Sequence, residues 1–320
     1  MRTLDDLERG IAAALQINGR ASFRSIAGVL GANERTVTRA GQALLNEGVV
    51  GVTGLRAHSG AVLLRTACTI GAAKIACLGV AQRPECTFAY TVTGDVDMVA
   101  ELTVPTSRMS SLINNELVAL PGIARMETFP VLKYFRTVAN WRLGVLDAEQ
   151  IRALRPRDFG TISTLGREPE TEHAADNRIV EALRADGRIS AERVAREVGV
   201  SETTARRRID WLLERQVVQL RALVEPAAVG LPVEALLWLK LSPARLEEAG
   251  QAFARHPRVR YAAAVAGAAQ LVVNVTASTV QEFYAFLTHP DWASMLDDVV
   301  ISMVTGARKR GGWLLPPLDG

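Results

Sequence analysis

Residues 11–40 read IAAALQINGRASFRSIAGVLGANERTVTRA, and residues 179–208 read IVEALRADGRISAERVAREVGVSETTARRR. The two stretches belong to a longer repeat, in which residues 7–50 align without gaps on residues 175–218 at a shift of 168. About 15 of the 44 aligned positions are identical, which is far above chance for an alignment without gaps. We therefore expect the chain to consist of two similar halves.

Each copy of the repeat has the pattern of three short helices. Apolar residues recur at helical spacing over residues 4–15, and Gly19 follows where a helix can end in the left-handed conformation. Ser22 and Asn33 are suited to cap a second and a third helix, with Gly31 in the tight turn between them. The second copy repeats these signals with Gly187, Ser190, Gly199 and Ser201. Three short helices with a glycine in the turn are typical of a helix-turn-helix.

The residues after each copy alternate between strand and helix patterns. In the second half we expect strands at 235–242, 259–267, 269–277 and 299–307, and helices at 243–257 and 278–292. In the first half we expect strands at 61–69, 87–93, 97–104 and 123–131, and helices at 71–82 and 107–119. Both halves give the order β-α-β-β-α-β, which is ferredoxin-like. The predicted fold class is therefore α+β, with two tandem units, each a winged or three-helix helix-turn-helix head followed by a ferredoxin-like domain.

These patterns predict five segments. Residues 1–56 form the first head, 57–154 the first ferredoxin-like domain, 155–174 a linker, 175–224 the second head, and 225–320 the second ferredoxin-like domain. The linker is expected because this stretch combines Pro, Gly and charges of both signs without periodicity. The strands expected at 49–55 and 217–224 lead away from the heads.

The composition is that of an ordinary globular protein, with 48% hydrophobic and 22% charged residues, and this excludes a disordered or collagen-like chain. Nearly all of the 37 basic residues are Arg, which suits DNA contact but also follows from a GC-rich genome. Cys68, Cys77 and Cys86 have neither disulfide nor metal spacing, so we expect buried thiols in a reducing compartment. No signal peptide or membrane span is predicted, which favours a cytoplasmic location.

Taken together, these features resemble the Lrp/AsnC (feast/famine) family of bacterial transcription regulators. The matching residues are Gly19, Arg20, Ala27, Gly31, Thr36, Arg39, Val49 and Val50 in the head, and VTGDVD at residues 92–97. The resemblance covers nearly the whole chain, twice. Since ordinary members carry one such unit, this chain looks like a tandem-duplicated form.

The resemblance implies an effector site for an amino acid near the glycine turn. Thr93, Gly94 and Asp97 are the candidate residues in the first half, and Gly267 and Gln270 take the corresponding positions in the second. In this interpretation Asp97 meets the ammonium group, and backbone N–H groups near Gly94 meet the carboxylate. The alternative is a plain β-turn with a solvated carboxylate. Because Gln270 replaces Asp97, the two sites are not expected to be equivalent.

The start of the third helix of each head is the candidate DNA-reading surface, because a helix-turn-helix places it in the major groove. The candidate DNA-binding residues are Arg35, Thr36, Thr38 and Arg39 in the first head and Thr203, Thr204, Arg206, Arg207 and Arg208 in the second. Arg can read guanine, and Thr can contact phosphate or the thymine methyl group. The alternative is a solvated surface on a structural head. The Arg run favours the second head as the better reader, and Gly41 weakens the corresponding helix of the first.

Two further basic residues, Arg20 and Arg188, follow the first helix of each head. They are placed to reach phosphate or to pair with a neighbouring carboxylate.

We therefore expect a sequence-specific DNA-binding transcriptional regulator, modulated by an amino acid or a related metabolite. Its partners would be double-stranded DNA and further copies of the chain. An isolated ferredoxin-like sheet has an open face that needs a cover, which either the other ferredoxin-like domain of the same chain or a second chain can supply, and in both cases we expect a particle larger than one chain.

The alternative function is a siroheme decarboxylase-like enzyme of the same architecture. His58, His173, His256 and His289 are scattered without metal-ligand spacing, and no phosphate-binding loop or Gly-X-Ser-X-Gly motif occurs. No catalytic residue, metal or cofactor is therefore predicted.

Overall fold

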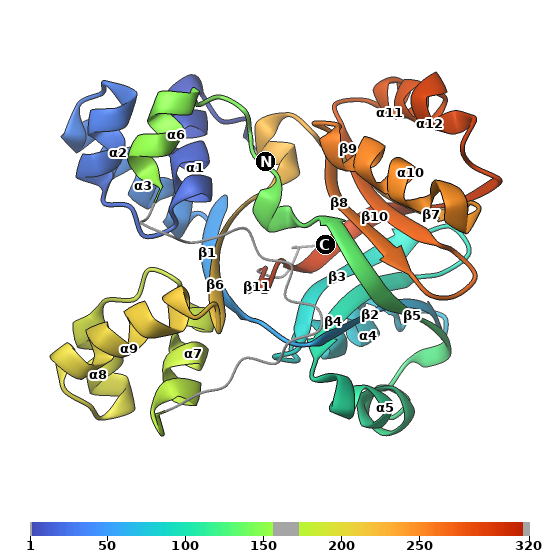
Figure 1. Ribbon diagram of the computed structural model, residues 1–320, viewed down its shortest axis with the longest axis horizontal. Coiled ribbons are helices and arrows are strands. Elements are labelled where there is room, and N and C mark those ends of the chain that lie inside the picture. The colour runs from blue at the N-terminus through green and yellow to red at the C-terminus, as the bar shows by residue number, and fades with distance from the viewer. Residues whose placement is uncertain (1, 156–172, 316–320) are drawn as a thin grey trace.

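A computed structural model describes residues 2–155 and 173–315. Two small helical heads lie on one side of the molecule, and a large β-structure flanked by helices lies on the other (Figure 1). The predicted linker, apart from its ends, falls on residues 156–172, outside the described residues.

Both heads contain the three helices that the repeat predicts. The first consists of α1 (Asp6–Ile17), α2 (Phe23–Leu30) and α3 (Glu34–Asn46), and the second of α7 (Asp176–Ala185), α8 (Ala191–Val198) and α9 (Glu202–Glu214). The predicted caps are confirmed, because backbone N–H groups of the following helix donate to the side chains of Ser22, Asn33, Ser190 and Ser201. Each head encloses an aliphatic core of its own.

Gly41 has a packing role that its helix propensity does not reveal. A Cβ atom at this position would lie 2.2 Å from the ring of Phe23, so the absence of a side chain lets α2 approach α3 closely. The second head has Ile209 and Ala191 at the matching positions, with the large and small residues exchanged. Gly41 is therefore part of a complementary fit.

The strands that leave the heads pair with each other. Strand β1 (Val50–Arg56) is antiparallel to β6 (Val218–Val224) over seven residue pairs, from Val50 opposite Val224 to Arg56 opposite Val218. In the described residues this two-stranded ribbon takes the place of a wing on either head, so the winged variant of the prediction is wrong. The ribbon joins the heads to each other and to the β-structure (Figure 1).

The remainder of each half has the predicted β-α-β-β-α-β order. The first half contains β2 (Gly60–Cys68), α4 (Ala73–Ala81), β3 (Cys86–Thr93), β4 (Met98–Val104), the short helical turns η1 (Thr106–Arg108), α5 (Met109–Ser111) and η2 (Leu112–Leu117), and β5 (Ile123–Arg136). The second contains η4 (Pro226–Val229), β7 (Val233–Lys240), α10 (Pro243–Arg255), β8 (Val259–Val265), β9 (Leu271–Ala277), α11 (Val280–Leu287), α12 (Pro290–Ala293), β10 (Asp298–Arg310) and β11 (Trp313–Leu314).

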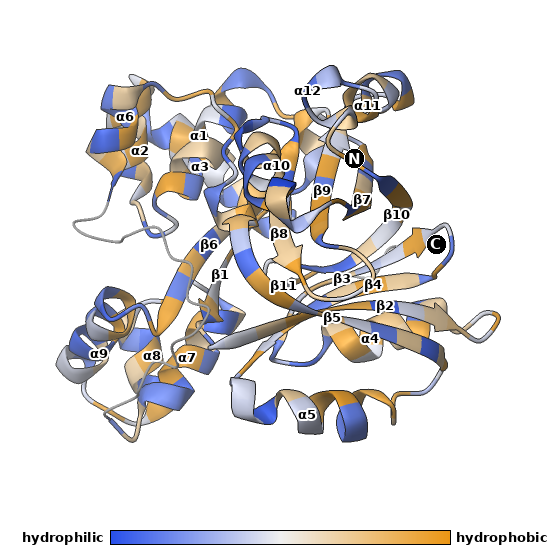
Figure 2. Ribbon diagram, turned by 45° about the vertical axis from the view of Figure 1, so that its right-hand side comes forward, coloured by the Kyte–Doolittle hydropathy of each residue, from blue (hydrophilic) through white to orange (hydrophobic). Residues whose placement is uncertain are grey.

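The last long strand of each half pairs both within its own half and with the other half, which closes a ring. The order is β10-β3-β4-β2-β5-β8-β9-β7, and β7 pairs again with β10. Strand β5 thus bridges β2 and β8, while β10 bridges β7 and β3. Apolar residues run along these strands (Figure 2), and one interior cluster contains residues of both halves, including Leu63, Phe129, Leu236 and Trp238. Each half therefore covers the other, and the cover that each sheet needs is supplied within one chain.

The segment after β5 returns to the first head, which the predicted boundary at residue 154 does not anticipate. Here η3 (Val138–Asn140) precedes α6 (Ala148–Leu154), whose Leu154 is buried in the core of the first head. The side chain of Gln150 donates to the carbonyl of Val29, and the Leu143 N–H donates to Gln16. Within the described residues, no helix is both long and apolar enough to cross a membrane.

Candidate nucleic-acid interface and effector site

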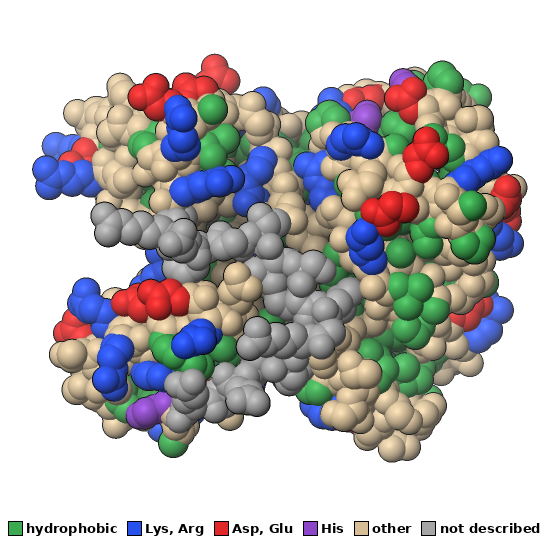
Figure 3. Space-filling view, viewed as in Figure 1, with side chains coloured by type: hydrophobic (Ala, Val, Ile, Leu, Met, Phe, Trp, Pro, Cys, Tyr) green, Lys and Arg blue, Asp and Glu red, His purple; other side chains and the backbone are tan. Residues whose placement is uncertain are grey.

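The starts of α3 and α9 carry most of the predicted DNA-binding residues on the surface. Arg35, Thr36 and Arg39 are exposed on α3, and Thr38 is half-buried. On α9, Thr203, Arg206 and Arg207 are exposed, and Thr204 is half-buried. Arg206 forms an exposed ion pair with Glu202 one turn earlier, and Arg207 occupies the place that Arg39 has in the first head. Basic side chains are visible over both heads, with acidic ones among them (Figure 3).

Arg208 is the exception, and its predicted role in DNA binding is wrong. Its guanidinium donates two hydrogen bonds to the Asp176 carboxylate, at 2.9 and 2.8 Å, and lies 4.1 Å from the ring centre of Trp211. Asp176 is fully buried and Arg208 is 8% exposed, so the pair lies inside the head. The first helical turns of α9 therefore present Arg206 and Arg207, but not Arg208.

Arg20 and Arg188 join the two heads. The Arg20 guanidinium donates to the carbonyls of Gly187 and Ile189, while Arg188 donates to those of Gly19 and Ala21. The exchange is reciprocal, as at a two-fold interface. Neither of the predicted alternatives, phosphate contact or a carboxylate partner, describes these contacts.

The predicted effector residues fall into two groups. Thr93 and Gly94 are exposed and line an open recess of about 500 Å³, whose remaining lining comes from Val280, Phe283, Tyr284, Leu287, Ile301 and Met303. Gly94 has a φ of 137°, and a Cβ atom there would lie 3.0 Å from the Ile301 carbonyl oxygen. The glycine turn of the first half thus lies against the second half.

Asp97, Gly267 and Gln270 lie outside the lining of this recess. The Asp97 carboxylate accepts a hydrogen bond from the Cys68 N–H, and the Gln270 side chain accepts one from the Leu241 N–H and donates to Gly267. Asp97 and Gln270 therefore accept hydrogen bonds from the same kind of backbone donor, an N–H group at the end of the first ring strand of each half. Gly267 lies beside Phe129.

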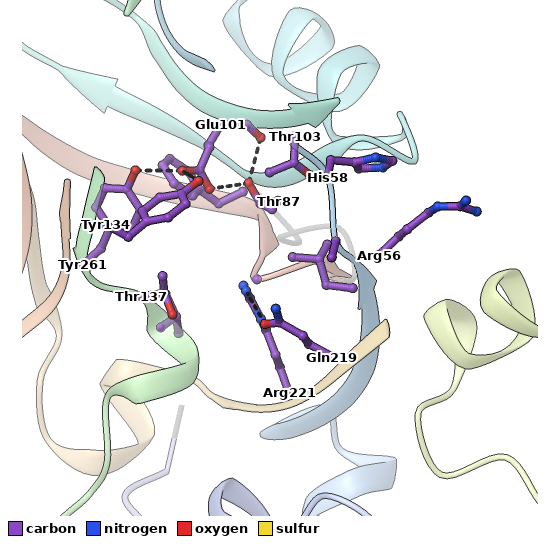
Figure 4. A pocket seen from close by; sticks show the side chains of 15 residues that line it. Arg56, His58, Thr87, Glu101, Thr103, Tyr134, Thr137, Gln219, Arg221 and Tyr261 are labelled. Carbon is purple, nitrogen blue, oxygen red and sulfur yellow. Dashed lines mark hydrogen bonds between the residues drawn. The ribbon is translucent and has the colours of Figure 1, made fainter. Parts of the chain in front are cut away.

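A second recess, which we call the joint recess, lies between the ribbon and the ring (Figure 4). Its polar lining includes Glu101 and Thr87 from the first half, Tyr134 on β5, Tyr261 from the second half and Arg221 on β6. Sequence patterns missed these residues because they come from distant elements that meet only in the folded chain. A lone Glu in the apolar pattern of β4 was the one available signal.

His58 lines the joint recess (Figure 4), whereas His256 and His289 serve local structure. His256 and His289 accept hydrogen bonds from the N–H groups of Arg258 and Asp291, and both pack against Trp292 on the outer side of the second half. Within the described ranges, no group of three or more His, Cys, Asp or Glu side chains could hold a metal ion.

Burial raises the pKa of Cys77 to about 12, which keeps this thiol protonated.

Two family models match the chain. The AsnC-type helix-turn-helix domain matches residues 174–213, in the second head. The Lrp/AsnC ligand binding domain matches twice, at residues 79–138 and 234–314.

The relatives found by sequence are transcriptional regulators. An uncharacterized HTH-type transcriptional regulator of Pyrococcus horikoshii is 29% identical over 113 residues, which cover 35% of this chain and 72% of that protein. The proline dehydrogenase transcriptional activator of Rhizobium radiobacter is 31% identical over 112 residues, covering 34% of this chain and 72% of that protein.

Among solved structures, the siroheme decarboxylase NirDL resembles the chain over almost its full length. The TM-score is 0.58, and the match covers 95% of this chain and 92% of that chain. The sequence identity is 14%, so this likeness concerns the fold alone.

Proposed function

Because this chain belongs to the Lrp/AsnC family of transcriptional regulators, we propose that it is a tandem fusion of two family units that binds specific DNA sequences with both heads. The observation that carries the proposal is the pair of exposed third-helix surfaces, Arg35 to Arg39 and Thr203 to Arg207, on two heads joined reciprocally. Two-fold related heads suit two half-sites on one DNA duplex. A cytoplasmic location follows from this role and is part of the proposal.

The two heads are unlike, which suits an operator with unlike half-sites. Two aligned positions on the reading surfaces differ, with Arg35 opposite Thr203 and Thr38 opposite Arg206. The aligned pairs Glu34 and Glu202, Thr36 and Thr204, and Arg39 and Arg207 are identical. We propose that the second head contributes more of the binding, since it presents two adjacent exposed Arg side chains.

The experiment that tests this function is selection of genomic DNA. Immobilised full-length chain is incubated with sheared genomic fragments at physiological salt, washed and sequenced. We expect a small set of upstream fragments to be enriched, because specific binding exceeds non-specific binding by several orders of magnitude. Uniform recovery of fragments would contradict the proposal.

We further propose that the recess beside Thr93 and Gly94 takes an amino acid or a related metabolite with an apolar side chain. Its apolar lining supports this, as does the exposed backbone of the turn, whose N–H groups suit a carboxylate. Because the Asp97 carboxylate accepts a hydrogen bond from the Cys68 N–H, we assign Asp97 a role in shaping the turn and not in binding the ammonium group.

Tyr284→Ser tests the effector site. Tyr284 is 66% exposed. Its counterpart in the first half, at the same distance after the glycine turn, is Ser111, so Ser is compatible with this helix surface. We expect calorimetric affinity for the responsive amino acid to fall about tenfold, since an aromatic contact is lost. Ile75→Ser, an equally exposed site outside the recess, should leave the affinity unchanged. Equal affinity in both variants would show that the recess is not the effector site.

Assembly is tested by light scattering at micromolar concentration. We propose that copies of the chain associate through exposed apolar side chains. A mass near that of one chain, 34.6 kDa, would contradict this.

The second candidate function is a siroheme decarboxylase-like enzyme, which the full-length likeness to NirDL favours. In the present structure the joint recess has about 40 Å³ of free volume, which is far too little for a tetrapyrrole. Addition of siroheme to the pure chain separates the two functions, because only the enzyme should give a shifted Soret band.

A further inference from the structure

The joint recess contains a buried carboxylate that is bonded to neutral donors. Glu101 is 4% exposed, and its Oε1 accepts hydrogen bonds from the Tyr134 and Tyr261 hydroxyls at 2.8 and 2.7 Å. Its Oε2 accepts one from the Thr87 hydroxyl at 2.6 Å. Burial and the Glu101 carboxylate raise the pKa of both tyrosines, which keeps them protonated as donors. In the described part of the chain, no Lys or Arg side chain pairs directly with Glu101.

The opposite wall holds a guanidinium that forms no ion pair with any residue that the structure describes. Arg221 and Gln219 extend from β6 into the recess and face the wall formed by Glu101 and the tyrosines (Figure 4). Arg221 forms a hydrogen bond of 3.3 Å with the Gln219 amide oxygen, and its buried Nε has no partner among the described residues. Burial lowers the pKa of Arg221, and the Glu101 charge opposes this shift. Opposite charges thus face each other across an open space.

The second half shows how the same place looks when it is filled. Asn274 lies as far beyond Gly267 as Glu101 lies beyond Gly94, and the two occupy equivalent positions in the strand pairing. Beside Asn274, Arg310 and Glu234 form a buried pair with two hydrogen bonds of 2.9 and 2.7 Å.

The first half has small residues at both positions of that pair. Ala61 and Thr137 stand where the second half has Glu234 and Arg310. Thr137 lines the joint recess, whose free volume of about 40 Å³ is enough for more than one water molecule. Buried charges are ordinarily paired, so a space between two opposite charges suits a ligand that carries both charges itself.

We propose that the joint recess binds a small zwitterion, a free α-amino acid of the size of glycine or alanine, with its ammonium group toward Glu101 and its carboxylate toward Arg221. The small free volume selects against larger side chains, and entry requires a shift of Arg221 and Gln219, which are both partly exposed. Since these two residues belong to the ribbon and Glu101 to the ring, the ligand ties the heads to the ring. An effect on DNA affinity rests on the proposed function, whereas binding itself does not.

The test is calorimetric titration of the full-length chain with glycine, L-alanine, L-leucine, acetate and methylammonium. We expect glycine or alanine to bind, and acetate and methylammonium to bind at least about tenfold more weakly, because each lacks one of two charge-assisted contacts. Leucine should be rejected from this recess. Absence of glycine and alanine binding, or equal binding of acetate, would overturn the proposal without any substitution in the protein.

The variants Glu101→Gln and Arg221→Met locate the site. Each should weaken binding about tenfold to a hundredfold, while Arg255→Met, on the exposed side of α10, should not. Tyr284→Ser should leave glycine binding unchanged, which separates this site from the recess beside Gly94. Wild-type affinity in a folded Glu101 or Arg221 variant would contradict the assignment. If neither variant folds, the comparison of glycine with acetate decides alone.

Discussion

Replacement of Arg208 by Ala is expected to lower the free energy of unfolding of the second head by about 3–5 kcal/mol, because it leaves the Asp176 carboxylate buried without its guanidinium partner. Asp176 has no exposed surface in the intact head, so the loss of two hydrogen bonds from Arg208 leaves its carboxylate poorly solvated. The ring of Trp211 also loses the cation that lies over it. Urea denaturation, followed by circular dichroism and tryptophan fluorescence, measures the loss.

The matched control for this prediction is Arg207→Ala, one residue earlier on the same helix. Arg207 is exposed, so the same substitution should change the free energy of unfolding by about 0.5 kcal/mol or less. Equal stability of the two variants would show that the Asp176–Arg208 pair does not hold the head together.

The double substitution Arg206→Ala and Arg207→Ala is expected to weaken binding to a selected DNA fragment by about tenfold to several hundredfold, with the fold preserved. A bidentate contact to guanine contributes about 1–3 kcal/mol, and each lost phosphate contact reduces the salt slope by about one unit. Arg206 gives up only an exposed pair with Glu202, which contributes little to stability. Fluorescence anisotropy at several salt concentrations measures both the affinity and the slope.

Two comparisons make this result interpretable. Arg255→Ala removes an exposed positive charge far from α9 and should leave the salt slope unchanged. Arg39→Ala should weaken binding less than the double variant if the second head is the stronger reader. A folded double variant with wild-type affinity and slope would remove α9 from the DNA interface.

The heads were predictable because their signals are local. Each helix has its own cap and turn within a few residues, and Ser22, Asn33, Ser190 and Ser201 all act as the sequence indicates. The sequence of strands and helices along each half was predictable for the same reason, since apolar alternation and turn residues recur at short range.

The role of Arg208 could not be read from the repeat, because the two heads neutralise the same buried acid differently. Glu8 and Asp176 occupy matching positions, but Glu8 is paired with Arg2 near the start of the chain, at 2.6 Å. The first head therefore needs no Arg at position 40 and has Ala there, whereas in the second head the matching Arg208 points inward and pairs with Asp176. An Arg on a reading helix is therefore not evidence of DNA contact until its neighbours are known.

The closed ring and the joint recess were not predictable because they depend on pairing between distant strands. Strand β5 meets β8, and β10 meets β3, only after both halves have formed. The pattern of alternating residues fixes which face of each strand is buried. It does not fix which strand of the other half pairs along the second edge of β5 or β10. The joint recess is assembled from both halves and the ribbon, so its residues could not be brought together without knowledge of this strand pairing.

In the proposed function, a single chain holds two unlike DNA-reading heads on one duplex. Hydroxyl-radical footprinting on a selected genomic fragment tests it most directly, with the wild type, the Arg206/Arg207 double Ala variant and an Arg35/Arg39 double Ala variant. We predict two protected tracts on the same face of the DNA, of which each variant loses a different one. No protected tract with the wild type, or loss of the same tract in both variants, would contradict the account.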